Sequence, residues 1–290
     1  MMKRVLVGTC AILGVAGVAA AAPISLPSGP IYGQYNNLEQ LNVNNSLTGP
    51  PGYAPAAGIC DATHPCGDWG VLNVSTLQFG AVVAPHVDIS GGTPFFTDGG
   101  VGGHQVTGIF YGFQIDPADH TKASGGVLDL YWHDSGSVDA TCLAGGGVCT
   151  PSDPGLLTTF ASGTFLARLD FASGIDPLDG TVTQSSNIDP STPGGSGHSD
   201  GYLNVDLSAG GAWASALNGQ WFNTVFGTRD LRFSSFFNVD VSSWGAPGGT
   251  VGIRSNDPVR DFITAGVPEP ATMTLLGLGL VGLGYRRRKK

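Results

Sequence analysis

Apolar and polar residues alternate with a period of two along the central part of the chain, and this pattern limits the fold more than any other feature. Within residues 128–133, the side chains of Leu128, Leu130 and Trp132 share one face, and Asp129 lies on the other. Successive side chains of a β-strand point to opposite faces, so this period is typical of half-buried strands in an antiparallel sheet. The same alternation marks four further segments, residues 109–115, 165–171, 203–207 and 231–241.

Clusters of Gly, Pro, Asn and Asp separate these segments, as at Asp116-Pro117 and Asp179-Gly180. Many short strands joined by such turns predict an all-β protein, an antiparallel β-sandwich or jelly roll, and we expect this domain to span residues 68–265. The one segment of it that is compatible with a helix is the short stretch Trp213–Phe222. In residues 109–115, one face is expected to carry Ile109, Tyr111, Phe113 and Ile115.

The composition agrees with a β-rich fold. The 290 residues include 46 Gly and 19 Pro, and charged residues make up only 12% of the chain. That share is about half the usual ~25%, and it is unlike a helical bundle or an α/β enzyme. Residues 22–67 are rich in Asn, Pro and Gly, so we expect an irregular arm there, ahead of a first strand near Val71.

The N-terminus has the layout of a secretory signal peptide. Lys3 and Arg4 form a short basic start, Val5–Val18 is apolar, and Ala19–Ala22 is a run of small residues. Residues 1–21 are therefore predicted to form a signal helix that signal peptidase removes after Ala20 or Ala21. The chain is expected to be exported.

Three elements follow one another at the C-terminus. The first is a Pro-Glu-Pro step, made of Val267, Pro268, Glu269 and Pro270. Because each proline disfavours helix in the residue before it, this step stays extended. The second is an apolar segment of 15 residues, Ala271–Tyr285, predicted to be a short transmembrane helix of roughly 22 Å. The third is a basic stop that holds the C-terminus on the cytoplasmic side, formed by Arg286, Arg287, Arg288, Lys289 and Lys290.

The order of these elements resembles the PEP-CTERM sorting tail of exported bacterial proteins, which are substrates of exosortase-type transpeptidases. The resemblance covers residues 266–290. It implies a transient anchor in the inner membrane, cleavage near Pro268-Glu269-Pro270, and delivery to the outer surface or extracellular matrix. Because proteins with this tail occur in Gram-negative bacteria that make exopolysaccharide, it also implies an association with exopolysaccharide.

The part of the chain between the two terminal segments is strongly acidic. It contains six Lys and Arg against 21 Asp and Glu, a formal net charge of −15. Phosphate binding needs clustered cations, so this charge argues against nucleic acid and anionic lipid as partners. It suits divalent cations or neutral polymers rich in hydroxyl groups; the alternative is that the charge only keeps a secreted protein soluble.

Four cysteines remain once the signal peptide is removed. Cys60 lies close in sequence to Cys66, and Cys142 lies close to Cys149. In an exported chain this spacing favours two local disulfides, although four cysteines permit three connectivities. The alternative is a zinc site of Cys60, His64 and Cys66, which neither the spacing nor an oxidising compartment favours.

Motifs of catalysis are missing from the sequence, so we expect no enzyme. The serine-hydrolase elbow G-x-S-x-G does not occur, and the only glutamates, Glu39 and Glu269, cannot form H-E-x-x-H. A glycosidase would need two placed carboxylates, for which the 20 Asp offer many accidental pairs. The neighbours Asp119-His120 and His133-Asp134 are predicted to be structural or exposed.

No cofactor is predicted, although calcium is an open alternative. Turn or strand-edge carboxylates offer hard oxygen ligands, in the sets Asp116 with Asp119, or Asp200 with Asn204 and Asp206. No D-x-D-x-D-G loop accompanies them, and Asp at the start of a turn ordinarily caps the backbone.

The sequence leaves three functional hypotheses. The first is a non-enzymatic surface or matrix protein associated with exopolysaccharide. The second is a carbohydrate-binding module, calcium-assisted or not, that uses exposed aromatic residues beside an acidic loop; Trp132 is expected in the core instead. The third is a secreted hydrolase.

Overall fold

The computed structural model describes residues 23–42, 67–83, 86–89, 93–99, 103–134, 159–190, 192, 194–239, 250–257 and 262–264. The predicted signal helix, the predicted transmembrane helix and the four candidate disulfide cysteines lie outside these residues. In the part of the chain that is described, no helix has the length and apolar character to cross a membrane.

Antiparallel strands make up nearly all of the described structure, which confirms the all-β prediction. The eight longest are β1 (Gly29–Asn42), β2 (Asp68–Val83), β5 (Gln105–Ile115), β6 (Lys122–His133), β7 (Thr164–Ala172), β9 (Ser196–Val205), β12 (Leu231–Val239) and β13 (Thr250–Asp257). The shorter strands are β3 (His86–Ile89), β4 (Phe96–Thr97), β8 (Gln184–Ser186), β10 (Phe222–Thr224), β11 (Gly227–Arg229) and β14 (Phe262–Thr264). All strand pairings that the structure defines are antiparallel.

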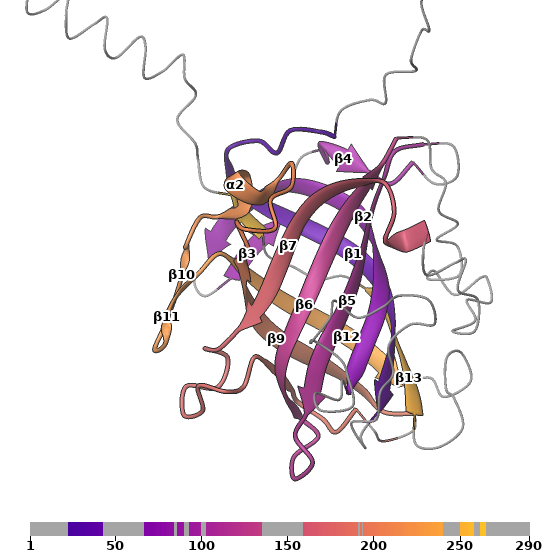
Figure 1. The fold of residues 1–290 in the computed structure, drawn as a ribbon, viewed down its shortest axis with the longest axis vertical. Coiled ribbons are helices and arrows are strands. Elements are labelled where there is room, and N and C mark those ends of the chain that lie inside the picture. Colours follow the sequence, from indigo (N-terminus) through magenta and orange to yellow (C-terminus); the bar gives the residue numbers. More distant parts are fainter. Residues whose placement is uncertain are drawn as a thin grey trace, which may run out of the picture.

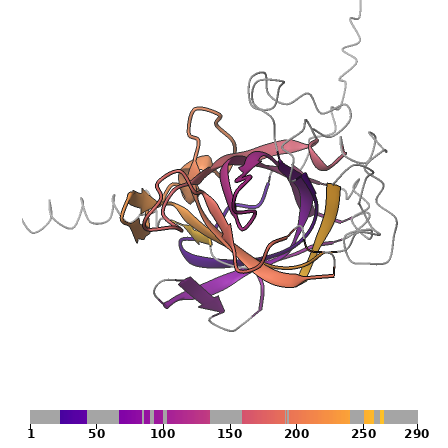
Figure 2. The same cartoon turned by 90° about the horizontal axis from the view of Figure 1, so that it is seen from below.

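The long strands form one sheet that closes on itself. Strand β1 pairs with β2 on one side and with β13 and β14 on the other, and both of these also pair with β12. From β2 the sheet continues through β5, β6, β7 and β9 back to β12. The result is a cylinder of strands, seen from the side in Figure 1 and along its axis in Figure 2. The predicted sandwich of two packed sheets is therefore replaced by a single continuous sheet.

Strand β1 accounts for this difference, because it lies within the segment that was predicted to be an irregular arm. Its sequence, GPIYGQYNNLEQLN, carries three Asn, two Gln and one Glu among few apolar side chains. Even so, Ile31, Tyr35 and Leu41 are buried in the core. Asn37 and Glu39 lie at the same alternate positions of the strand as these three core residues. Polar residues therefore interrupt the apolar–polar alternation that would reveal a strand in the sequence.

Two bulges change which residues face the interior. In β2, Val74 and Leu77 both belong to the core because an extra residue shifts the register with β1 between Gln34 and Tyr35. In β5, Phe110 and Phe113 both point inward, since they pair with Gly70 and Asp68 across a second shift.

Because of the second bulge, the prediction that Ile109, Tyr111, Phe113 and Ile115 share one face is wrong. Phe113 and Ile115 belong to the core, whereas the hydroxyl of Tyr111 bonds to Asp129 on the other face of the sheet. Gly112, between them, has a φ of +85°, a conformation that glycine adopts without steric cost.

Aromatic rings fill the middle of the cylinder. Phe113 packs edge-on against Phe171 with 4.6 Å between ring centroids, and Phe171 contacts Phe233 at 5.4 Å. Phe233 in turn stacks on Tyr35 at 5.8 Å. These four rings come from β5, β7, β12 and β1, so they join opposite walls of the cylinder through apolar contact.

A short helix covers one end of the cylinder. The segment predicted as helix Trp213–Phe222 forms only α2 (Ala214–Leu217), and Phe222 already begins β10. The Trp213 indole donates a hydrogen bond to the Ile24 carbonyl at 2.8 Å, and Leu217 belongs to the core. Figure 1 shows α2 at this end, and the small cavity there is lined by apolar residues such as Leu26, Leu77 and Leu217. Trp132 is also buried in the core, as predicted.

A charged pair ties β6 to β7 on the outer face. Arg168 Nε lies 2.7 Å from Asp129 Oδ1, and the Arg168 Nη2 donates to Asp129 Oδ2 at 2.8 Å. The two residues are register partners, and the Tyr111 hydroxyl donates to the same carboxylate at 3.1 Å. The Asp129 side chain is only 1% exposed, so its charge depends on these partners for stabilisation.

Replacing Arg168 by Met is expected to destabilise the fold by about 3 kcal/mol, because Asp129 would keep a buried charge without its main partner. Urea unfolding followed by tryptophan fluorescence measures this change. The double variant Arg168→Met with Asp129→Leu should recover most of the loss, since it removes both charges. A single variant as stable as the native protein would contradict the assigned role.

Candidate functional site

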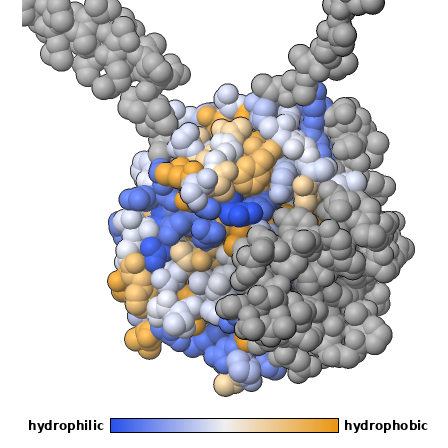
Figure 3. Space-filling view, viewed as in Figure 1, coloured by the Kyte–Doolittle hydropathy of each residue, from blue (hydrophilic) through white to orange (hydrophobic). Residues whose placement is uncertain are grey.

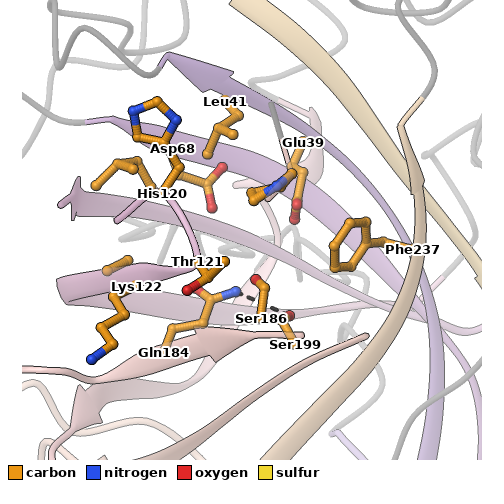
Figure 4. Close-up of a pocket in the computed structure, with 13 residues that line it drawn as sticks. Glu39, Leu41, Asp68, His120, Thr121, Lys122, Gln184, Ser186, Ser199 and Phe237 are labelled. Atoms are coloured by element: carbon orange, nitrogen blue, oxygen red, sulfur yellow. Dashed lines mark hydrogen bonds between the residues drawn. The ribbon is translucent and has the colours of Figure 1, made fainter. Parts of the chain in front are cut away.

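A polar cavity lies at the end of the cylinder opposite α2. Its walls come from β1, β2, β5, β6, β8, β9, β12 and the turn between β5 and β6 (Figure 4). The polar side chains that line it include Glu39, Asp68, His120, Gln184, Ser186 and Ser199. The cavity volume is about 20 Å³, which is room for a single water molecule or ion.

Strand register brings the two acids of this cavity together. Glu39 pairs with Gly70, and Leu41 pairs with Asp68, so the acids are diagonal neighbours on the inner face of β1 and β2. Diagonal neighbours in a sheet are roughly 7–8 Å apart, within reach of two carboxylate side chains. Figure 4 shows both carboxylates pointing into the cavity, with the amide of Gln184 across from them.

Burial dominates the electrostatics of the pair. Desolvation raises the pKa of Glu39 to about 7, against a smaller lowering by the amide of Asn37, which donates to Glu39 Oε2 at 3.0 Å. Desolvation also raises the pKa of Asp68 well above its usual value, and the neighbouring Glu39 adds to this rise. Asp68 is buried and Glu39 is half-buried. Two desolvated carboxyl groups side by side disfavour double ionisation, so the pair retains a proton near neutral pH when nothing else binds.

Several acceptor oxygens around the pair have no hydrogen-bond partner among the described residues. These are Asp68 Oδ1, Asn37 Oδ1 and Gln184 Oε1. The amide nitrogen of Gln184 donates to Ser199 Oγ at 3.1 Å, which leaves its oxygen as the free end. A buried acceptor without a donor costs free energy, so this arrangement favours an added cation or donor.

The basic residues at the cavity are engaged with other carboxylates. Lys122 Nζ lies 2.9 Å from Asp176 and points away from Glu39 and Asp68 in Figure 4. His120 Nδ1 lies 3.4 Å from Asp189. Neither ion pair brings positive charge to the acidic pair.

The first set of candidate calcium ligands from the sequence, Asp116 and Asp119, caps a turn. Asp116 Oδ1 accepts from the Ala118 amide at 2.8 Å, and Asp119 Oδ1 accepts from both the amide and the hydroxyl of Thr121. These bonds hold the turn between β5 and β6. The described residues contain no group of three or more His, Cys, Asp and Glu side chains that could hold a metal.

The second candidate set, Asp200 with Asn204 and Asp206, makes separate contacts. Asp200 pairs with Arg232 at 3.2 Å, and Asp206 Oδ1 accepts from the amide and hydroxyl of Ser208. Asn204 is a register partner of Asp170 in β7. The structure does not bring these residues together.

The adjacent acid–histidine pairs of the sequence do not form dyads. Asp119 caps Thr121, whereas its neighbour His120 contacts Asp189. The ring of His133 is buried and lies 2.8 Å from the Thr107 hydroxyl, and Asp134 lies near His104 instead. Burial lowers the pKa of His133, so this ring is neutral near pH 7.

A second feature is the hairpin of β10 and β11, which protrudes from the side of the cylinder (Figure 1). Trp221 is 46% exposed, Val225 69% and Phe226 41%. Leu178, in the loop after β7, is 94% exposed, and Gly180 of this loop lies against the Phe226 ring. Figure 3 shows apolar surface gathered at the end of this hairpin.

Arg229 holds the hairpin against the cylinder. Its Nε donates to the Ser173 carbonyl at 2.7 Å, and its Nη2 donates to the Ser173 hydroxyl and the Phe226 carbonyl, each at 3.0 Å. The exposed apolar side chains are therefore presented on an anchored element. Trp69, Trp132 and Trp213 are all buried, so Trp221 is the exposed tryptophan among the described residues.

The comparison with known proteins identifies the tail. The PEP-CTERM protein-sorting motif matches the chain over residues 266–289, a match that includes the Pro-Glu-Pro step and all of the basic stop except Lys290. No curated protein and no solved structure matches the chain. The chain therefore carries a signal for export, membrane-anchored transit and exosortase-type processing. The matched residues lie outside those that the structure describes.

The raised pKa of Glu39 predicts a pH-dependent stability in the presence of a chelator. A carboxyl group whose pKa rises on folding stabilises the fold below its unfolded pKa and loses this contribution as pH rises through about 7. The groups facing it are Asp68 from β2, Gln184 from β8 and the rim residues His120 and Lys122.

Thermal unfolding between pH 4.5 and 8 should therefore show the native chain losing stability, by up to about 1.4 kcal/mol per pH unit, while Glu39→Gln loses less. Asp116→Asn, which keeps the turn cap, is the matched control and should follow the native profile. Parallel profiles for the native chain and Glu39→Gln would contradict the assigned burial of this carboxyl group.

Proposed function

We propose that the protein is a non-enzymatic component of the cell surface or extracellular matrix, and that it associates there with exopolysaccharide. The single observation that carries this proposal is the PEP-CTERM sorting motif at residues 266–289. Signal peptidase removes residues 1–21, and the C-terminal segment holds the chain in the inner membrane until an exosortase-type transpeptidase acts near Pro268-Glu269-Pro270. The acidic body is then transferred to an acceptor outside the cell.

Two observations support a role without catalysis. The acids that the fold brings together, Glu39 and Asp68, line a cavity with room for one water molecule, which does not admit a sugar ring. The adjacent acid–histidine pairs contact different partners. A secreted hydrolase therefore has less support than a binding or structural protein.

The protruding hairpin supports direct contact with carbohydrate. An exposed tryptophan offers a flat apolar face on which a sugar ring can stack. The loop that carries Asp176 and Asp179, whose Gly180 lies against the Phe226 ring, offers hydrogen-bond acceptors. Both carboxylates already cap turn amides, at Leu178 and Thr181, so the acidic loop has a defined shape. The net charge of −15 between the terminal segments favours a neutral polymer over an anionic one.

Sorting is tested by changing the acid of the Pro-Glu-Pro step. The native chain should lose its tail and leave the inner membrane, whereas Glu269→Ala should remain full-length in that membrane because the processing enzyme no longer recognises it. Intact mass and cell fractionation measure both properties. Asp261→Ala, outside the matched motif, is the control and should be processed normally. Equal full-length accumulation of the native chain and Glu269→Ala would instead indicate a plain C-terminal anchor.

Carbohydrate contact is tested at the hairpin. Trp221→Ala should weaken binding to exopolysaccharide of the producing cells about tenfold, since one stacking contact is worth roughly 1–1.5 kcal/mol. Affinity electrophoresis in gels that contain the polymer measures this change. Leu207→Ala, a similarly exposed apolar residue in the turn after β9, should leave binding unchanged. Equal retardation of both variants and the native chain would rule out the hairpin as the contact.

A further inference from the structure

We propose that Glu39, Asp68 and the amide oxygen of Gln184 form a binding site for one divalent cation, with calcium as the best fit. This site lies at the polar end of the cylinder, and it does not depend on the proposed contact with carbohydrate. It also differs from the turn carboxylates that the sequence suggested as calcium ligands.

The first argument is that the cavity presents acceptors without donors. Asp68 is 3% exposed, yet its Oδ1 has no hydrogen-bond partner among the described residues. Gln184 directs its amide nitrogen to Ser199, which turns the unpartnered Oε1 toward the acids (Figure 4). Asn37 donates to Glu39 and keeps a free, buried Oδ1 behind it. A water molecule can donate hydrogen bonds to only two of these oxygens, whereas a cation can be coordinated by every oxygen that reaches it.

The second argument is charge. Two carboxylates side by side in a desolvated site repel each other, and the nearby Lys122 and His120 are paired with Asp176 and Asp189. A divalent cation would balance both charges in place of the shared proton. Acidic groups in such a site are otherwise a net cost to the fold.

The third argument concerns the kind of ion. The candidate ligands are carboxylate, amide and hydroxyl oxygens, the donors that hard cations prefer, and Thr121 and Ser186 add hydroxyl groups to the same lining. A volume of about 20 Å³ accepts one bare ion. Mg²⁺ holds several waters in octahedral geometry, so this small cavity fits Ca²⁺ better.

Binding would join three strands that are far apart in sequence. Glu39 lies in β1, Asp68 in β2 and Gln184 in β8, which pairs with both β6 and β9. A cation between them would connect opposite walls at the end over which the described residues place no helix. We therefore expect calcium to stabilise the fold rather than to take part in a reaction.

The test is thermal unfolding of the full-length chain in mild detergent at pH 7.5, with EDTA, CaCl₂ or MgCl₂. The native chain should gain about 5 °C or more in 10 mM CaCl₂ and less in MgCl₂. Asp68→Asn should be at least as stable as the native chain in EDTA, because it removes a buried charge, but should gain nothing from calcium. Asp116→Asn, a charge removal in the adjacent turn, should respond to calcium like the native chain.

Isothermal titration with CaCl₂ provides the second readout. One site is expected for the native chain and for Asp116→Asn, with binding at least tenfold weaker in Asp68→Asn and in Glu39→Gln. Loss of binding in Asp116→Asn alone would place the ion at the turn and overturn the proposal. Absence of any calcium response in the native chain would show that the acids share a proton only, which also overturns it. Neither result depends on tail processing or on carbohydrate binding.

Discussion

Closure of the sheet through β1 is the constraint on which the rest of the structure depends. This strand pairs with β2 along most of its length and with β13 and β14 along its other edge, so it joins the first and last parts of the sheet. Closing a sheet removes its free edges and encloses one interior. The aromatic contacts from Tyr35 to Phe113 exist because β1 stands opposite β7 across that interior.

The enclosed interior divides into two chemically different ends. Near α2, apolar residues such as Leu26 and Leu217 close the cylinder. At the other end the same strands carry Glu39 and Asp68, and no comparable helix covers them among the described residues. The short β8 narrows that end by pairing with β6 and β9 beyond the end of β7. Among the described residues, the acidic side chains of the interior therefore lie at one end of the cylinder, and apolar side chains line the other.

Local pattern predicted the strands of the central region well, because residues such as Leu130 and Phe237 alternate cleanly with polar neighbours. It did not predict β1, where Asn37 and Glu39 take inward positions, nor the bulge that separates Phe110 from Phe113. Both depend on which strands become neighbours, which is a long-range property. The pairing of Glu39 with Asp68 is hidden for the same reason: the two are 29 positions apart, and only the register makes them diagonal neighbours.

The position of β14 has a mechanical consequence. Its three residues pair with the start of β1, and the sorting tail begins just beyond Thr264. Tension applied through that tail, during transfer or from a tethered polymer, would fall first on β14. The cylinder of strands would remain closed if β14 detached, because β13 pairs independently with both β12 and β1. Detachment of β14 would therefore lengthen the connection to the tail while the closed sheet stays intact.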